Sequence, residues 1–299
     1  VAGVLLGGRL GYCVFYAPDL FLKFKDSFPV WGVLALNEGG MSAHGGIIGL
    51  ILAASLYAMK TGVHRLYLYD LIAITGPLGL LMVRIANFIN GELVGRPCPV
   101  DFPFAVKFPQ DILQWPSHDP SRLSGLSAVI EKMPSDLMQG HTVSDWNIWL
   151  SQMTTDSAAY KSVVDTLYAI IHAIQDGRLE IRDTLATVLT PRYPSQLLEA
   201  LLEGALLFLI IFFYLRKPRK PGTAGALFVV LYSIFRIVGE NFRLPDAHIG
   251  YQLLDLTRGQ WLSIVMLVIG VVLMFLWSRQ GGLSLSGWGR GQSVKLHRR

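Results

Sequence analysis

Apolar residues gather in six long runs along this chain, with polar segments between them. A helix that spans a membrane needs about 20 mainly apolar residues. The runs predict spanning helices over Val1–Phe15, Gly45–Met59, Leu66–Phe88, Leu197–Leu215, Thr223–Ile237 and Gln260–Trp277. The hydropathy pattern therefore predicts an all-α polytopic membrane protein with about six transmembrane helices.

The first run begins directly at Val1, with neither a Met nor a positively charged segment before it. A secretory signal peptide would carry such a charged segment. We therefore expect no signal peptide here, and we interpret the sequence as truncated at its N-terminus.

Basic residues mark one side of the predicted helices. They lie in the turn at 60–65, in the turn at 216–220 and in the tail at 279–299. Short loops rich in Lys and Arg stay in the cytoplasm. Six successive spans place these three segments on one side, so the other connections are expected to be extracytoplasmic.

One of those outer connections is long enough to form a small domain. Residues 160–174 repeat apolar positions at helical spacing before Gly177, and a second short helix is expected over Glu180–Leu189. The predicted organisation is membrane helices over 1–96, a helical extracytoplasmic cap over 97–192, membrane helices over 193–278 and a basic cytoplasmic tail over 279–299.

Composition supports a membrane class and argues against others. Only 16% of the residues are charged and 52% are hydrophobic, whereas soluble domains have about 25% charged residues. The net charge of +5 is not arranged as a basic stripe interleaved with aromatic residues, so nucleic acid is not an expected partner. Cys13 and Cys98 lack the spacing of a metal site and are expected to be unpaired thiols.

Polar residues cluster where the predicted helices reach the outer side. A charged group inside a span costs about 2.5–3.5 kcal/mol on insertion scales, so each needs a reason. Residues three, four or seven positions apart share a helix face, and those faces are expected to line one cavity. The polar residues at these outer ends are His44, Arg84, Asn87, Asn90, Glu92, Ser195, Gln196, Glu199, Glu203, Arg236, Glu240, Arg243 and Gln260.

Structural explanations compete with a functional one for these residues. Arg84 and Arg236 can reach lipid headgroups, or pair with Glu199 and Glu240 to hold helices together. A histidine such as His44 is often only a satisfied polar residue. Arginines on two helices, with amides and a histidine at one depth, favour a binding or catalytic site.

Five motifs carry a family resemblance. They are GGMSAHGG at Gly39–Gly46, RIANFINGELVGRP at Arg84–Pro97, PSQLLE at Pro194–Glu199, RIVGENFRLPD at Arg236–Asp246 and GQWLSI at Gly259–Ile264. In this order and spacing the chain resembles the prolipoprotein diacylglyceryl transferase family, over about 1–110 and 190–278.

Three features depart from that family's usual pattern. Tyr193 and Leu198 stand where its members usually have a histidine and a tyrosine. The family has seven helices, so its first helix is expected to be missing here, together with a tyrosine that the family uses. The connection between Pro97 and Pro191 is also longer than expected.

The resemblance implies a reaction. Members of the family move the diacylglyceryl group of phosphatidylglycerol to the lipobox cysteine of a preprolipoprotein, which gives a thioether and glycerol 1-phosphate. This is the first step of bacterial lipoprotein maturation. The resemblance implies no cofactor or metal, and a location in the bacterial cytoplasmic (inner) membrane with the active site toward the periplasmic face.

The same resemblance suggests roles for individual residues. Arg84 and Arg236 are expected to hold the phosphate, with Arg243 as a weaker third. His44 is the candidate base for the substrate thiol, and Glu240 is its rival. The expected substrate-binding residues are Arg84, Asn87, Asn90, Gly95, Gln196, Glu199, Arg236, Glu240 and Arg243.

Two other functions use the same residues without bond breaking. One is a transporter or scaffold that binds an anionic phospholipid, and the other is a structural membrane subunit. No internal inverted repeat is visible and the predicted inner helix ends carry only loop charges, which argues against transport.

Overall fold

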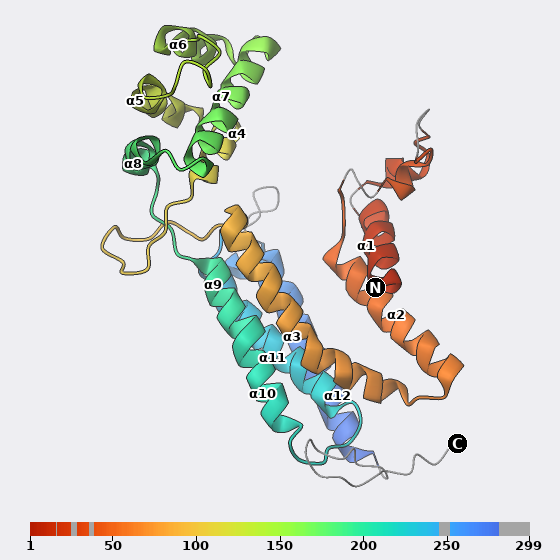
Figure 1. Cartoon of the computed structure of the whole chain (residues 1–299). Helices are drawn as coiled ribbons and strands as arrows, with labels where there is room; N and C mark the ends of the chain where they lie inside the picture. Colours follow the sequence, from red (N-terminus) through yellow and green to blue (C-terminus); the bar gives the residue numbers. More distant parts are fainter. Residues whose placement is uncertain (16, 25–28, 36–38, 245–251, 281–299) are drawn as a thin grey trace. The chain divides into compact units, whose positions relative to one another are not determined.

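The computed structural model describes residues 1–15, 17–24, 29–35, 39–244 and 252–280, with the backbone alone at residues 15, 43 and 44. Within these ranges every regular element is a helix, and β-pairing is limited to isolated bridges. Figure 1 shows the helices in chain order. The all-α prediction is therefore confirmed for the described residues.

The α-helices and one π-helical segment have the following bounds: α1 Ala2–Phe15, α2 Ala43–Thr61, α3 Arg65–Asn90, α4 Trp115–His118, α5 Ser127–Glu131, α6 Val143–Gln152, α7 Ser157–Gln175, α8 Leu179–Val188, α9 Ser195–Glu199, η6 (the π-helix) Ala200–Leu206, α10 Leu207–Tyr214, α11 Thr223–Glu240 and α12 Arg258–Arg279.

Four of the predicted spans are helices long and apolar enough to cross a membrane. They are Arg65–Asn90, Ser195–Tyr214, Thr223–Glu240 and Arg258–Arg279. The apolar helical stretches Ala2–Val14 and Gly45–Thr61 are shorter. The chain is thus a multi-pass, membrane-embedded protein, and the number of about six spans stays a prediction.

Contacts divide the chain into two compact units. Among the described residues, the first contains those of Val1–Pro77, Leu207–Tyr232 and 266–280. The second contains Leu78–Leu206 and Ser233–Val265. The four helices long and apolar enough to cross a membrane each contribute residues to both units.

The first unit contains a closely packed helix pair. Helices α1 and α2 lie side by side (Figure 1), and glycines line their interface. A Cβ atom on Gly49 would lie 2.0 Å from the carbonyl oxygen of Gly3. Small residues let helix backbones approach each other, which is how many membrane helices associate.

A buried carboxylate fixes the start of α11 in the same unit. Asp70 on α3 accepts hydrogen bonds from the backbone N–H groups of Gly222 at 2.7 Å and Gly225 at 2.8 Å. These N–H groups lie at a helix N-terminus, where they have no partner within the helix and favour negative charge.

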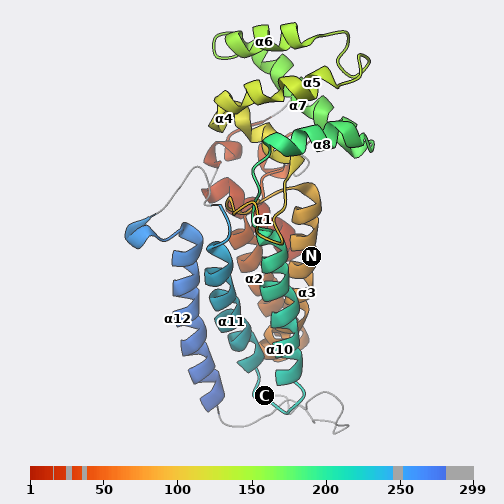
Figure 2. The same ribbon diagram turned by 90° about the vertical axis from the view of Figure 1, so that its left-hand side faces the viewer.

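Figure 2 shows α11 beside α12, where Gly270 lies against Val229.

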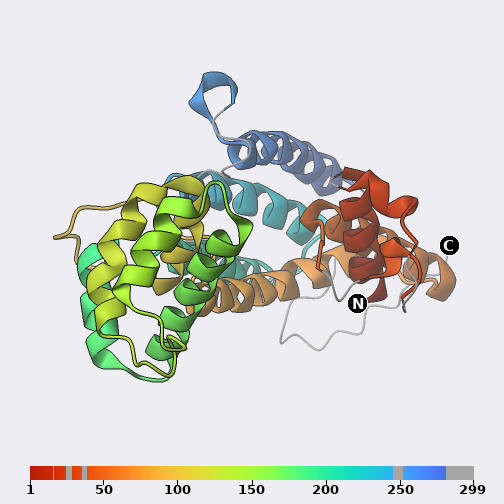
Figure 3. The same ribbon diagram turned by 90° about the horizontal axis from the view of Figure 1, so that it is seen from above.

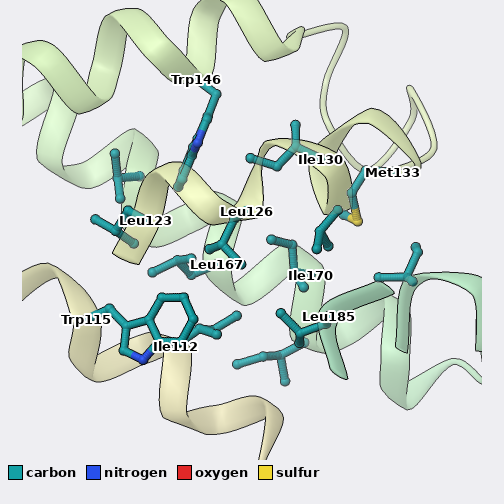
Figure 4. Close-up of a cluster of buried hydrophobic side chains, with 14 of the residues drawn as sticks. Ile112, Trp115, Leu123, Leu126, Ile130, Met133, Trp146, Leu167, Ile170 and Leu185 are labelled. Carbon is teal, nitrogen blue, oxygen red and sulfur yellow. The ribbon is translucent and has the colours of Figure 1, made fainter. Parts of the chain in front are cut away.

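The second unit contains the cap between α3 and α9. Its apolar core includes Ile112, Trp115, Leu123, Leu126, Trp146, Leu167, Ile170 and Leu185 (Figure 4). Figure 3 shows the cap helices from above, coloured yellow to green. Helices α7 and α8 confirm the two helices predicted there, and Gly177 between them has a φ of +85°.

Candidate functional site

Five ionisable side chains from three spanning helices meet in the second unit. This ionic cluster consists of Arg84 on α3, Glu199 on α9, Glu203 on η6, and Arg236 and Glu240 on α11. Arg84 lies 3.1 Å from Glu199 and 3.2 Å from Glu203. Arg236 lies 2.7 Å from Glu199, 3.6 Å from Glu203 and 2.8 Å from Glu240.

Burial within the cluster differs between the two signs of charge. The side chains of Glu199 and Glu203 are 0% exposed, whereas those of Arg84 and Arg236 are 11% and 13% exposed. The two arginine side chains are therefore the most exposed members of the cluster.

Local helix geometry brings the two central glutamates together. Glu199 ends α9, and the π-helix Ala200–Leu206 follows at once and carries Glu203. Single π-helical turns inside α-helices often occur at functional sites. Here the turn places two carboxylates on one face, and Arg84 contacts both.

The start of α12 is tied to the cluster. Thr257 donates its hydroxyl hydrogen to Glu240 at 3.0 Å and accepts from the backbone N–H of Gln260. Gln260 accepts in return from the backbone N–H of Thr257 at 3.0 Å, which is the reciprocal pattern of a capping box. Four spanning helices therefore contribute to one polar network.

The segment that follows α3 packs against the start of α9 and the end of α11. Gln196 donates to the carbonyl oxygen of Glu92 at 2.6 Å. Gly95 pairs with Arg243 in an isolated β-bridge. A Cβ atom on Gly95 would lie 2.0 Å from the carbonyl oxygen of Tyr193, so no larger residue fits at position 95 without a backbone shift.

The predicted site residues fall into those that lie in the ionic cluster and those that lie beside it. Arg84, Glu199, Arg236 and Glu240 lie in the ionic cluster itself. Gln196 and Gly95 lie in the segment that packs beside it. Arg243 contributes its backbone, which pairs with Gly95 and accepts from the Arg96 side chain at 2.8 Å.

The two asparagines of the RIANFINGE motif lie outside the ion pairs. Asn87 is half-buried on α3, and no hydrogen bond from its side chain is found among the described residues. Asn90 is exposed, with its amide 3.5 Å from Glu92. Their substrate-binding roles stay predictions.

His44 belongs to the first unit, as the second residue of α2. The helix starts after Ser42, whose hydroxyl accepts from the N–H of Gly45 at 3.2 Å. Arg9 holds the preceding turn, because its buried guanidinium donates to carbonyl oxygens that include those of Gly32 and Gly40. Arg9 is therefore a hydrogen-bonding strut, and the role of His44 as base stays a prediction.

Sequence reasoning placed Glu203 among the polar residues expected to line the cavity but gave it no substrate-binding role, and it missed Arg192 and Asp111. The helical spacing between Glu199 and Glu203 was the signal that could have added Glu203 to the predicted binding residues. Arg192 forms a buried ion pair with Asp111 at 2.9 Å and donates to the carbonyl oxygen of Gly95 at 3.1 Å. Asp111 lies far away in the sequence, and no local pattern points to this pair.

Comparison with known proteins places the chain in a family. The family described as prolipoprotein diacylglyceryl transferase matches residues 1–276. The chain is 54% identical over 297 residues to the phosphatidylglycerol–prolipoprotein diacylglyceryl transferase of Bdellovibrio bacteriovorus, covering 99% of this chain and 83% of that protein.

More distant relatives carry the same name. The protein from Burkholderia thailandensis is 37% identical over 284 residues, or 94% of this chain and 77% of its own length. The protein from Neisseria gonorrhoeae is 35% identical over 276 residues, or 91% and 75% of the two chains. The chain therefore belongs to the prolipoprotein diacylglyceryl transferase family and is a transferase.

Proposed function

We propose that the ionic cluster is the active site at which this transferase binds the phosphate of phosphatidylglycerol and moves the diacylglyceryl group to the lipobox cysteine of a preprolipoprotein. The observation that carries the proposal is the order of burial. The two arginine side chains are the most exposed part of the cluster, and the carboxylates of Glu199 and Glu203 that pair with them are fully buried.

Arginine suits a phosphodiester that is cleaved during the reaction. Its guanidinium is always charged and binds phosphate oxygens in a bidentate fork. Negative charge grows on the phosphate as its bond to the glycerol carbon breaks. Arg84 and Arg236 then stabilise the transition state more than the bound substrate.

The three carboxylates position the arginines. With all groups ionised, two arginines and three glutamates give the cluster a formal charge of −1. Such a buried network contributes little net stability, because removing charges from water is costly. Its role here is to hold the two guanidinium groups at a set separation before the lipid arrives.

The nucleophile comes from the protein substrate. Cys13 and Cys98 are buried and unpaired, and burial raises the pKa of the Cys98 thiol. Protonated buried thiols are poor nucleophiles. The substrate sulfur forms a bond to the glycerol carbon, the bond from that carbon to the phosphate oxygen breaks, and the electron pair leaves with glycerol 1-phosphate.

A base is needed because a thiol with a pKa of about 8.5 is mostly protonated at neutral pH. His44 takes the thiol proton in this proposal. Its rival Glu240 is held by Arg236 at 2.8 Å and by the hydroxyl of Thr257 at 3.0 Å. Both oxygens of the Glu240 carboxylate therefore already contact a partner. The leaving phosphate monoester has a second pKa of about 6 and scarcely needs an acid.

The charge distribution supports an orientation in the bacterial cytoplasmic (inner) membrane. Basic residues flank the α2–α3 turn and lie in the α10–α11 turn, at Lys60, Arg65, Arg216, Lys217, Arg219 and Lys220. Cytoplasmic placement of these turns puts the ionic cluster and the cap on the periplasmic face. Helices α1 and α2 then supply the remaining two of six spans.

One assay tests the reaction. The full chain is incubated with phosphatidylglycerol and a lipobox peptide, and the peptide mass is measured. We expect a gain of one diacylglyceryl group, and none when the peptide cysteine is replaced by serine. Tight lipid binding with no mass gain under any condition would instead identify a lipid-binding scaffold.

A further inference from the structure

A second feature of this unit is an apolar pocket of about 580 Å³ on the outer surface of α9. Its walls come from the segment after Pro97, from the first two turns of α9 and η6, and from Phe242 beyond α11. The lining residues that carry the inference are Phe102, Ala105, Tyr193, Leu198, Leu201 and Phe242.

Three aromatic rings in mutual contact line this pocket and preorganise its wall before a ligand binds. The rings of Phe102 and Tyr193 are 5.0 Å apart, and those of Tyr193 and Phe242 are 5.5 Å apart, both edge to face. This is the geometry that aromatic pairs prefer. The backbone N–H of Tyr193 also donates to the carbonyl oxygen of Arg96 at 3.0 Å, which anchors the backbone that carries the central ring.

The pocket opens onto the lipid-facing side of a spanning helix. Leu197 and Leu201 line it, and they are 40% and 57% exposed on the span Ser195–Tyr214. Exposed leucines on such a helix face hydrocarbon in a membrane. The pocket is therefore continuous with a surface that contacts acyl chains.

The chemistry of the lining identifies the class of ligand. Nearly all of the lining side chains are apolar, and the hydroxyl of Ser195 already donates to the carbonyl oxygen of Leu93. An extended peptide would leave its own N–H and C=O groups unpaired in such a site. An acyl chain has no polar group to satisfy.

The pocket and the ionic cluster use different faces of the same short helix. Leu198 directly precedes Glu199, and Phe242 follows Glu240 by two residues. At helical spacing Leu197, Leu198 and Leu201 share a face that differs from the face of Glu199 and Glu203. Substitutions in the pocket therefore leave the arginine contacts in place.

We propose that this pocket holds one acyl chain of the phospholipid donor and sets the chain length that the enzyme prefers. The proposal rests on the proposed function, which supplies a two-chain lipid as substrate. Tyr193 and Leu198, the two positions that depart from the family's usual motif, both line the pocket. The preferred chain length is thus a property of this chain's own residues.

An internal competition tests the pocket. The full chain receives an equimolar mixture of short-chain and long-chain phosphatidylglycerol with a lipobox peptide, and product masses report which lipid was used. Leu198→Trp and Ala105→Phe fill the pocket. Each should shift the product ratio toward the short chain by at least about fivefold, the lower end of what overpacking an apolar site costs.

Matched controls separate the pocket from general effects. Leu209→Trp adds the same bulk to an exposed position further along the same span, and it should leave the ratio unchanged. Leu198→Tyr is a milder variant that decides the matter if Leu198→Trp does not fold. An unchanged ratio in both pocket variants would overturn the proposal, as would a raised KM for the peptide with no change in lipid choice.

A second measurement does not depend on turnover. Phosphatidylglycerol with a photoactivatable group in one acyl chain should crosslink to peptides that contain Phe102 or Leu198, and Ala105→Phe should abolish this. Crosslinks that avoid both peptides would refute the pocket. Absence of product from wild type with either lipid would refute the proposed function, while the crosslink still decides on the pocket.

Discussion

Glu199 contacts both arginines of the ionic cluster through different oxygens. Its Oε1 lies 2.7 Å from Nη1 of Arg236, and its Oε2 lies 3.1 Å from Nη1 of Arg84. One fully buried carboxylate therefore sets the separation of two guanidinium groups that come from different helices.

Replacing either arginine by lysine should greatly reduce transfer. Arg84→Lys and Arg236→Lys keep the charge and lose the planar fork that binds phosphate oxygens. The alanine variants should be worse, since breaking a buried ion pair typically costs about 3–5 kcal/mol of stability. Turnover with a lipobox peptide measures the effect, with Arg216→Lys as a control in the basic turn. Near-normal turnover of Arg84→Lys would show that bidentate phosphate binding by Arg84 is not part of the mechanism.

Neutralising one buried carboxylate should favour the lipid. Glu203→Gln keeps the volume and changes the formal charge of the cluster from −1 to 0. Two unit charges 4 Å apart interact by about 1 kcal/mol even in water, so KM for phosphatidylglycerol should fall by about fivefold. Glu199→Gln should instead lower kcat, because Glu199 makes the shorter contact with each arginine, at 3.1 Å to Arg84 and 2.7 Å to Arg236, against 3.2 Å and 3.6 Å for Glu203. Steady-state kinetics at varied phosphatidylglycerol concentration separate an effect on KM from an effect on kcat. If both variants lowered kcat equally, Glu199 and Glu203 would not have distinct roles.

His44→Ala should lower turnover much more than lipid binding. A general base typically contributes about 10²–10⁴-fold, so the loss should fall in that range. The loss should shrink as pH rises toward the thiol pKa of about 8.5, because the thiol then ionises without help. Turnover from pH 7 to 9 measures this, with His172→Ala in the exposed face of α7 as control. His44→Gln keeps a hydrogen bond without basicity, and rescue by it would make His44 structural.

Breaking the buried pair behind Gly95 should loosen the base of the cap. Asp111→Asn leaves the Arg192 guanidinium without its charged partner, and such changes typically cost about 3–5 kcal/mol. The exposed pair Arg182–Asp183 gives the control, since Asp183→Asn should change stability by about 1 kcal/mol or less. Thermal unfolding and hydrogen exchange over 97–111 and 188–193 measure both. Equal effects of the two variants would refute a special role for the buried pair.

Sequence alone determined the long helices and the two cap helices α7 and α8. A membrane helix pairs its backbone internally, so a long apolar run specifies its structure without knowledge of its neighbours. The signal for α7 was equally local, because its apolar residues recur at helical spacing and Gly177 follows them. The motifs also placed Arg84, Glu199, Arg236 and Glu240 at one end of their helices, since all lie near a predicted helix terminus.

Tertiary structure decided which of these groups meet. The pairing of Arg84 with Glu199 and Glu203 depends on how helices are rotated about their axes and on the π-helix that carries Glu203. Hydropathy reveals neither the rotation of a helix about its axis nor a π-helical turn. Asp111 and Arg192 meet across the whole cap, and the aromatic pocket joins Phe102 to Phe242. Contacts between residues so far apart depend on packing, and packing is a property of the folded chain as a whole.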